Sequence, residues 1–167
     1  RGLRPEPLKV ACAHPDTRGE RDRIGGRHVL DDAMRFLLTG DEAAAARARG
    51  VLVAGPACGD GYEQTPAGGH ALAYDWIWSA LSGAARRSIE SALAACGANI
   101  ATALRGEGPH LWHGFTAQAS ALALIALALD DPAQRDRLLA DAFELFRGRA
   151  LEAYAVTGGA WPEGYSY

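Results

Sequence analysis

Two groups of polar and aromatic residues near the end of the chain could take part in chemistry. The first contains His110, Trp112 and His113, and the second covers residues 161–167. An imidazole can pair with a carboxylate, a phenol can donate or accept a proton, and an indole can stack on a sugar ring or close a core. The two groups could therefore form one acid–base site if the fold brings them together.

The segment between these groups predicts a helical hairpin. Ala and Leu dominate residues 115–129, and an amphipathic stretch covers residues 132–156. An Asp-Asp-Pro turn at residues 130–132 joins them, with Pro at the first helical position. If the two helices are antiparallel neighbours, both groups lie at the same end of the hairpin. His113 would then stand near the start of the first helix.

Three motifs resemble those of one protein family. They are Trp-His-Gly-Phe at residues 112–115, Gly-Gly-Ala-Trp-Pro-Glu-Gly-Tyr-Ser-Tyr at residues 158–167 and Leu-Ala-Tyr-Asp-Trp-Ile-Trp at residues 72–78. All three are similar to the helical domain of heparinase II/III-type polysaccharide lyases, a group that includes alginate lyases of similar architecture. The resemblance extends from about Arg27 onward, and the last motif is its most specific part.

By this resemblance, the chain is part of the catalytic domain of a lyase that cleaves a heparin-, heparan- or alginate-like polysaccharide by β-elimination. The reaction must neutralise a uronate carboxylate, remove the C5 proton and protonate the departing O4 atom. The resemblance assigns the first task to His113 and the acid or acid–base role to Tyr167. It implies that five further residues bind the substrate, namely His110, Trp112, Trp161, Glu163 and Tyr165.

The phenol of Tyr167 needs help to act as a base. Its ordinary pKa of about 10 is too high for this role at neutral pH unless nearby cations lower it. His113 and an arginine are candidates for these cations. The sequence also departs from the family, because Leu111 and Trp112 precede His113 where many relatives carry Asn. Neutralisation would then fall to His113 together with His110.

Structural interpretations of the same residues remain open. The i, i+3 spacing of His110 and His113 could face one metal ion, but no third ligand follows nearby, so we expect neither a metal nor a cofactor. His113 could instead cap a helix or be satisfied in the core. Tyr165 and Tyr167 could pack on a helix end, and Glu163 could accept a hydrogen bond within its loop.

Two other functional classes also remain. A toroid glycoside hydrolase would need a pair of carboxyl groups, for which Glu163 and Asp75 are the only plausible candidates. A non-catalytic helical carbohydrate-binding module would bind sugar without forming a product. Asp75 lies between Tyr74 and Trp76, whose position inside a predicted helix is better explained by packing.

Composition predicts an all-α fold with one core. Ala and Leu supply most of the apolar residues, and β-branched residues are scarce. The net charge of −3 comes without a basic run, and no apolar stretch has membrane-spanning character. We therefore expect an acidic polysaccharide as the partner, and neither nucleic acid nor a membrane.

The chain divides into an irregular arm, residues 1–26, and a helical domain, residues 27–167. Six helices are predicted. The first covers residues 27–38, the second runs from an Asp41 cap to Ala54, and the third begins at Pro66. The fourth runs from a Ser82 cap to about Leu104, the fifth begins near His113 after a loop at residues 105–109, and the sixth runs from Pro132 to about Val156. They would form three antiparallel hairpins. By comparison with the lyase family, this is about half of an incomplete α/α toroid.

Two expectations follow from an incomplete toroid. The natural polypeptide should continue beyond Tyr167, and this chain alone should be nearly inactive. Cys12, Cys58 and Cys96 have no metal-type spacing and allow at most one disulfide within the chain. A periplasmic or secreted location is implied by the resemblance alone.

Overall fold

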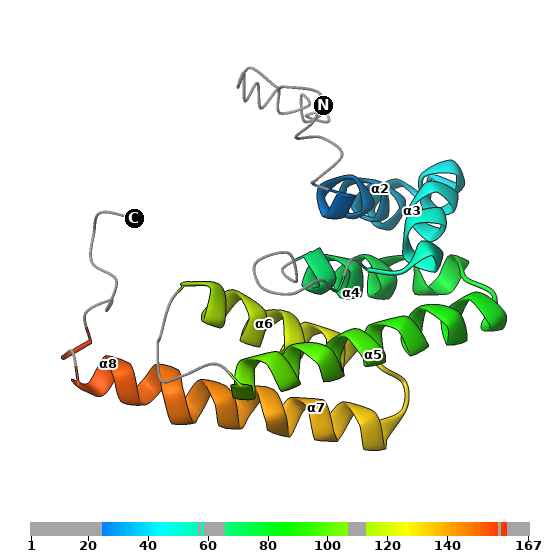
Figure 1. Ribbon diagram of the computed structural model, residues 1–167. Helices are drawn as coiled ribbons and strands as arrows, with labels where there is room; N and C mark the ends of the chain where they lie inside the picture. Colours follow the sequence, from blue (N-terminus) through cyan, green and yellow to red (C-terminus); the bar gives the residue numbers. More distant parts are fainter. Residues whose placement is uncertain (1–24, 57, 59–65, 107–112, 157, 160–167) are drawn as a thin grey trace, which may run out of the picture.

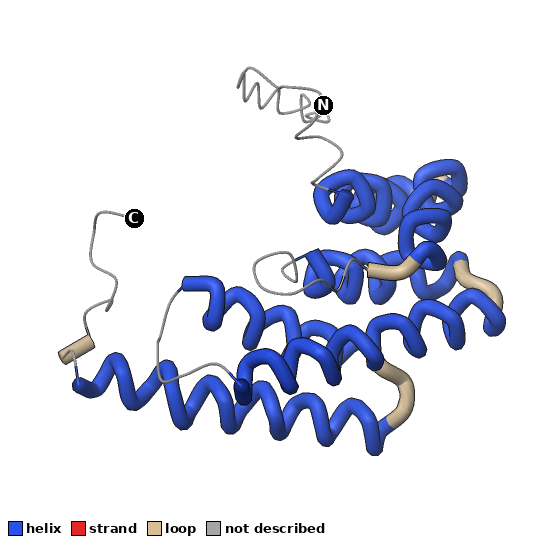
Figure 2. The backbone as a smooth tube through the Cα atoms, viewed as in Figure 1, coloured by secondary structure: helices blue, strands red, loops and turns tan. Residues whose placement is uncertain are grey.

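The computed structural model describes residues 25–56, 58, 66–106, 113–156 and 158–159. Every regular element in these residues is a helix (Figures 1 and 2). Apolar residues at helical spacing and the scarcity of β-branched residues account for this. The prediction of an all-α fold is therefore confirmed.

The helices begin and end close to the predicted positions. They are α2 (Gly25–Thr39), α3 (Glu42–Ala54), α4 (Pro66–Ile77), η2 (Trp78–Ala80), α5 (Gly83–Gly106), α6 (His113–Ala128), α7 (Pro132–Leu145), η3 (Phe146–Leu151) and α8 (Glu152–Val156). Two boundaries need correction. Residues 25 and 26 belong to α2 rather than to the irregular arm, and α5 continues beyond Leu104 to Gly106. The other residues of that arm lie outside the described part of the chain.

Three helix starts are fixed by side-chain caps, and two of these caps, Asp41 and Ser82, were predicted. The carboxylates of Asp41 and Asp131 each accept hydrogen bonds from two backbone N–H groups of the turn that follows. The hydroxyl of Ser82 accepts one from the N–H of Ala85 at 3.2 Å. These bonds satisfy donors that have no partner within the helix, which is why the starts were readable in the sequence.

The last three elements form one continuous helix from Pro132 to Val156. The residues at the two junctions, Phe146 and Glu152, both keep right-handed helical dihedral angles. The middle element, η3, is a π-helical stretch, in which the turn is wider than in an α-helix. The predicted sixth helix therefore has the predicted length, with a local widening that the sequence did not indicate.

The helices pack in two layers. Helix α4 packs between α2 and α6, while α5 and α7 pack on α6 and on each other. In Figure 1, α4 and α6 run in one direction, and α5 and α7 run in the other. Helix α4 contacts α5 much less than it contacts α2 and α6. Of the three expected antiparallel hairpins, α2 with α3 and α6 with α7 are in close contact, whereas α4 and α5 are not a tight pair.

The core between α5, α6 and α7 depends on a close approach at Gly97. A Cβ atom at this position would lie 2.9 Å from Cδ1 of Leu138 and 3.2 Å from Cγ2 of Ile125. Both of these side chains are fully buried. The absence of a side chain at Gly97 therefore lets α5 approach the other two helices closely.

A disulfide joins Cys58 to Cys96, with 5.5 Å between the two Cα atoms. It ties the segment after α3 to a buried position in the middle of α5. The sequence allowed one such bond but did not identify the pair. Closing a loop of 38 residues lowers the entropy of the unfolded chain, which is worth about 4 kcal/mol in the loop-entropy account.

Several large apolar side chains remain exposed on the described residues. They include Leu127 on α6, Phe143 on α7 and Phe146 on η3. On α2, Met34 and Leu37 are also exposed, whereas Val29 and Ala33 are buried in the core. Among the described helices, none has the length and apolar character needed to cross a membrane.

Candidate functional site

His113 is the first residue of α6, as predicted. The antiparallel helix formed by α7, η3 and α8 returns the chain to the same end of the molecule, where α8 ends at Val156 (Figure 1). The other candidate residues lie outside the described part of the chain: His110, Trp112, Trp161, Glu163, Tyr165 and Tyr167. The convergence of His113 and Tyr167 thus stays a prediction, although the hairpin that it requires is present.

An arginine that the sequence did not single out lies at this end. The guanidinium carbon of Arg149, in η3, is 5.5 Å from the ring centroid of Phe115, which is fully buried in the first turn of α6. Its Nη2 atom donates a hydrogen bond of 3.2 Å to the carbonyl oxygen of Arg105, near the end of α5. Arg149, in η3, therefore joins the end of α5 to the start of α6.

Two polar atoms near the start of α6 are buried without a hydrogen-bond partner among the described residues. They are Nη1 of Arg149 and Oγ1 of Thr116. An unpaired buried polar group costs about 1–3 kcal/mol, so such groups usually meet a further partner. The guanidinium can donate to a carboxylate, and the hydroxyl can donate or accept. This end of the hairpin is thus suited to an acidic ligand.

A cavity of about 320 Å³ lies beside Arg149, and a larger cavity of about 430 Å³ lies between α5 and the start of α7. The smaller cavity is lined by Arg105, Asp141, Glu144, Leu145, Gly148 and Arg149. Arg105 makes an ion pair with Asp141 across α5 and α7. Arg149 is the cation of this cavity that has a buried donor atom, Nη1, without a hydrogen-bond partner among the described residues.

Arg149 could not have been identified from its spacing in the sequence. It is one of several arginines on an amphipathic helix, and Arg147 stands two residues before it. In a regular α-helix pattern both would be assigned to a solvated face. The π-helical stretch and the crossing of α6 determine which of the two meets Phe115, and both are tertiary features.

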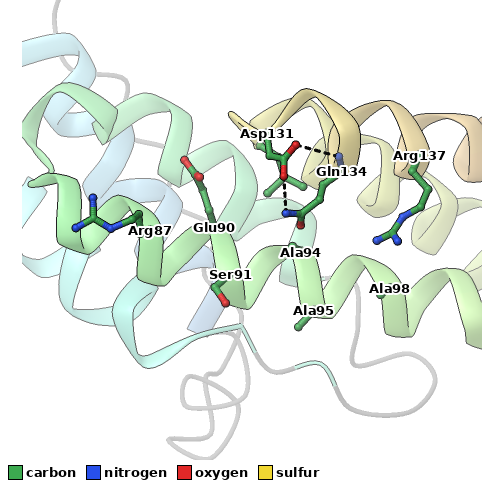
Figure 3. A pocket seen from close by; sticks show the side chains of 10 residues that line it. Arg87, Glu90, Ser91, Ala94, Ala95, Ala98, Asp131, Gln134 and Arg137 are labelled. Atoms are coloured by element: carbon green, nitrogen blue, oxygen red, sulfur yellow. Dashed lines mark hydrogen bonds between the residues drawn. The ribbon is translucent and has the colours of Figure 1, made fainter.

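The larger cavity is a polar groove at the opposite end of the α6–α7 hairpin (Figure 3). Beside it, the buried phenol of Tyr74 donates a hydrogen bond to the carboxylate of Glu90. Burial raises the pKa of Glu90, and Asp130 raises it further through its charge and a hydrogen bond, while the bond from Tyr74 opposes this. Burial also raises the pKa of Tyr74 above its ordinary range. The phenol of Tyr74 and the carboxyl group of Glu90 thus hold their protons more firmly than they would in water.

The residues of the 72–78 motif serve mainly in packing. Tyr74 is fully buried, Trp76 packs against the core, and Asp75 is exposed. The guanidinium of Arg86 lies 3.4 Å above the ring of Trp78 and so covers one face of it. Within the described residues, no three His, Cys, Asp or Glu side chains gather into a metal site.

No family model matches the chain, and no curated protein or solved structure is significantly similar to it. The function is therefore inferred from the motifs and from the two ends of the α6–α7 hairpin. One end carries His113 and Arg149. The other carries the polar groove.

Proposed function

We propose that the chain is part of the helical catalytic domain of a polysaccharide lyase that cleaves a uronic-acid-containing polymer by β-elimination. The proposal rests on the motifs at residues 112–115 and 158–167. The observation that carries it is the position of Arg149, a cation with an unused donor atom beside the first turn of α6. In this proposal Arg149 is the arginine that, with His113, lowers the pKa of the Tyr167 phenol.

In this proposal His113 and Arg149 bind the carboxylate of the uronate residue. Their positive charge stabilises the negative charge that develops when the C5 proton leaves. Tyr167, with its pKa lowered by these cations, accepts the C5 proton. The electron pair of the C5–H bond forms the C4–C5 double bond, the C4–O4 bond breaks, and the proton is delivered to O4 from the same phenol.

We further propose that the helices form about half of an α/α toroid. Support comes from the two-layer packing, in which α4 has α2 and α6 as its neighbours and α5 lies beside α7. A continued toroid would place a further hairpin on the flank of α6 and α7. The exposed apolar side chains of α6, α7 and η3, Leu127, Phe143 and Phe146, are candidates for such a contact. The chain alone would then lack part of the site and have little activity.

A periplasmic or secreted location is part of the same proposal. It is supported by the disulfide between Cys58 and Cys96, because such bonds persist mainly in oxidising compartments. Acidic polysaccharides are also substrates that an enzyme meets outside the cytoplasm. Thiol titration of the protein isolated from each compartment would test this part.

A non-catalytic carbohydrate-binding module is the second candidate function. It is favoured by the polar groove of about 430 Å³, whose size suits a small ligand. The glycoside hydrolase alternative has less support, because Asp75 is exposed on α4 and its proposed partner Glu163 lies outside the described residues. The products separate these classes, since only a lyase forms an unsaturated uronate.

The proposal is tested by a screen of polymers with the natural full-length polypeptide. Heparan-type and alginate-type chains should yield a product with the ultraviolet absorbance of an unsaturated uronate. The same polymers with their carboxylates reduced to alcohols should yield none, because the C5 proton is then no longer acidic. Cleavage of the reduced polymers, or cleavage without unsaturated product, would contradict the proposal.

A further inference from the structure

The polar groove lies between α5 and the start of α7, far from His113 along the hairpin (Figure 3). Its floor is a row of small side chains on α5, namely Ala94, Ala95 and Ala98. Arg87, Glu90 and Ser91 line it from α5, and Gln134 and Arg137 line it from α7. Two helices thus supply polar groups to one elongated surface.

The cations of the groove stand at its two ends. Figure 3 shows Arg87 at one end of the labelled row on α5, and Arg137 on the facing helix close to Ala98 at the other end. Ala98 lies 11 positions after Arg87, which corresponds to about 16 Å along the helix. Both arginines are exposed, and neither makes an ion pair or hydrogen bond with another described residue. Each guanidinium therefore has its paired donors available for a ligand.

The acidic groups of the groove are already engaged by the protein. Asp131 accepts hydrogen bonds from two backbone N–H groups of α7 and from the side-chain amide of Gln134, as Figure 3 shows for Gln134. Glu90 is held by Tyr74 and shares a hydrogen bond with Asp130. Arg137 also acts on Asp131 through its charge, but neither arginine donates a hydrogen bond to another described residue. The groove thus combines two arginines that keep hydrogen-bond donors for a ligand with two acids that are tied to neighbouring groups, and so it favours an anionic ligand.

We propose that this groove binds a short, linear acidic oligosaccharide. Arg87 and Arg137 pair with carboxylates at two separate positions of the ligand, and Ser91 and Gln134 contact hydroxyl groups between them. The separation of the cations suits a chain better than a single small anion. Single-stranded nucleic acid would need aromatic side chains for base stacking, and none of the described residues that line the groove is aromatic.

This site goes beyond the proposed catalytic function and shares only its substrate class. It lies at the end of the hairpin that does not carry His113. A second binding site on the same protein would keep a polymer close to the catalytic end after each cleavage, because it raises the effective concentration of the substrate there. The groove is thus a holding site rather than a site of chemistry.

Calorimetric titration of the 167-residue chain with a defined oligouronate tests the proposal. Arg87→Gln and Arg137→Gln should each weaken binding about tenfold, because each removes one charge-assisted contact. Arg135→Gln is the matched control. Arg135 lies on α7, the helix that carries Arg137, but it pairs with Asp136 and does not line the groove. This control should leave the affinity unchanged, and circular dichroism should show that all three variants are folded.

Three results would overturn the proposal. The chain could fail to bind the oligouronate, the control could lose as much affinity as the groove variants, or an oligoglutamate of equal charge could bind equally well and compete for the same arginines. The last result would indicate an acidic peptide as the partner. Binding in this experiment does not require turnover. The groove can therefore bind the oligouronate even if the protein is not a lyase, and the protein can be a lyase even if the groove binds nothing.

Discussion

At the scale of single residues, Arg149 makes two identified contacts and keeps one donor unused. Its Nη2 atom binds the carbonyl of Arg105, and its guanidinium lies 5.5 Å from the ring centroid of Phe115. Its Nη1 atom is buried and has no partner among the described residues. A purely structural arginine would be expected to satisfy this atom within the protein. The unused donor therefore distinguishes Arg149 from the ion-paired Arg105.

Arg149→Gln in the full-length polypeptide should lower kcat/KM for a polyuronate about 10- to 100-fold. The change removes a charge-assisted contact to the substrate carboxylate, which is worth about 1.5–3 kcal/mol. Steady-state kinetics measures the effect. Arg147→Gln is the control, because Arg147 is exposed on the same helical stretch. Equal losses in the two variants would show that Arg149 has no special role.

The pKa of Glu90 predicts a pH-dependent contribution to stability. Burial raises this pKa above its ordinary value of 4.5, so the folded chain holds the proton more tightly than the unfolded chain does. The contribution of Glu90 to stability is fully present below its pKa in the unfolded chain, and it is lost as the pH rises through its pKa in the folded chain. The groups that face Glu90 are Tyr74, Asp130 and Arg86, and none of them reverses this direction.

Urea unfolding of the wild type and Glu90→Gln between about pH 4 and pH 7 measures this contribution. The glutamine keeps the shape and can still accept from Tyr74, but it does not titrate. The wild type should lose stability relative to Glu90→Gln as the pH rises. Asp75→Asn, at an exposed carboxylate on α4, should not show the same trend. Parallel curves for the wild type and Glu90→Gln would refute the assignment.

At the scale of the elements, the sequence predicted the starts of helices better than their packing. Asp41, Ser82 and Asp131 are local signals, because each caps the turn that follows it. The neighbours of a helix depend on residues distant in the sequence. Arg87 and Arg137 are 50 positions apart, so their common groove could not be read from spacing. The pairing of Cys58 with Cys96 was hidden for the same reason.

Gly97→Ala tests the packing of α5 on α6 and α7. The added methyl would meet Leu138 and Ile125 at 2.9 and 3.2 Å, and should cost about 1–3 kcal/mol of unfolding free energy. Gly50→Ala is the control, because its position inside α3 has no heavy atom within 4 Å of the new Cβ. It should stabilise the protein by about 0.5–1 kcal/mol through helix propensity.

Chemical denaturation measures both changes. Opposite signs are expected, since the same substitution meets a packed interface at one site and open space at the other. If Gly97→Ala is as well tolerated as Gly50→Ala, α5 does not approach the other helices as closely as described. The two-layer arrangement would then lose one of its main contacts.

At the scale of the whole molecule, the hairpin from α6 to α8 separates two polar regions. His113 and Arg149 lie at one end, and the groove with Arg87 and Arg137 lies at the other. The sequence predicted the first region through its motifs and the hairpin, although not its arginine. It gave no sign of the second, because alanines and scattered arginines on a helix have no distinctive pattern. The two regions together suit a protein that holds and cleaves an acidic polymer.

The most direct test of this account is the rate at which the full-length polypeptide forms unsaturated uronate, for the wild type and for Tyr167→Phe. The phenylalanine keeps the ring and removes the phenolic proton, so the rate should fall by about 10²- to 10⁴-fold while circular dichroism stays the same. An unchanged rate in Tyr167→Phe, or a wild-type product that is saturated, would contradict β-elimination at this end of the hairpin.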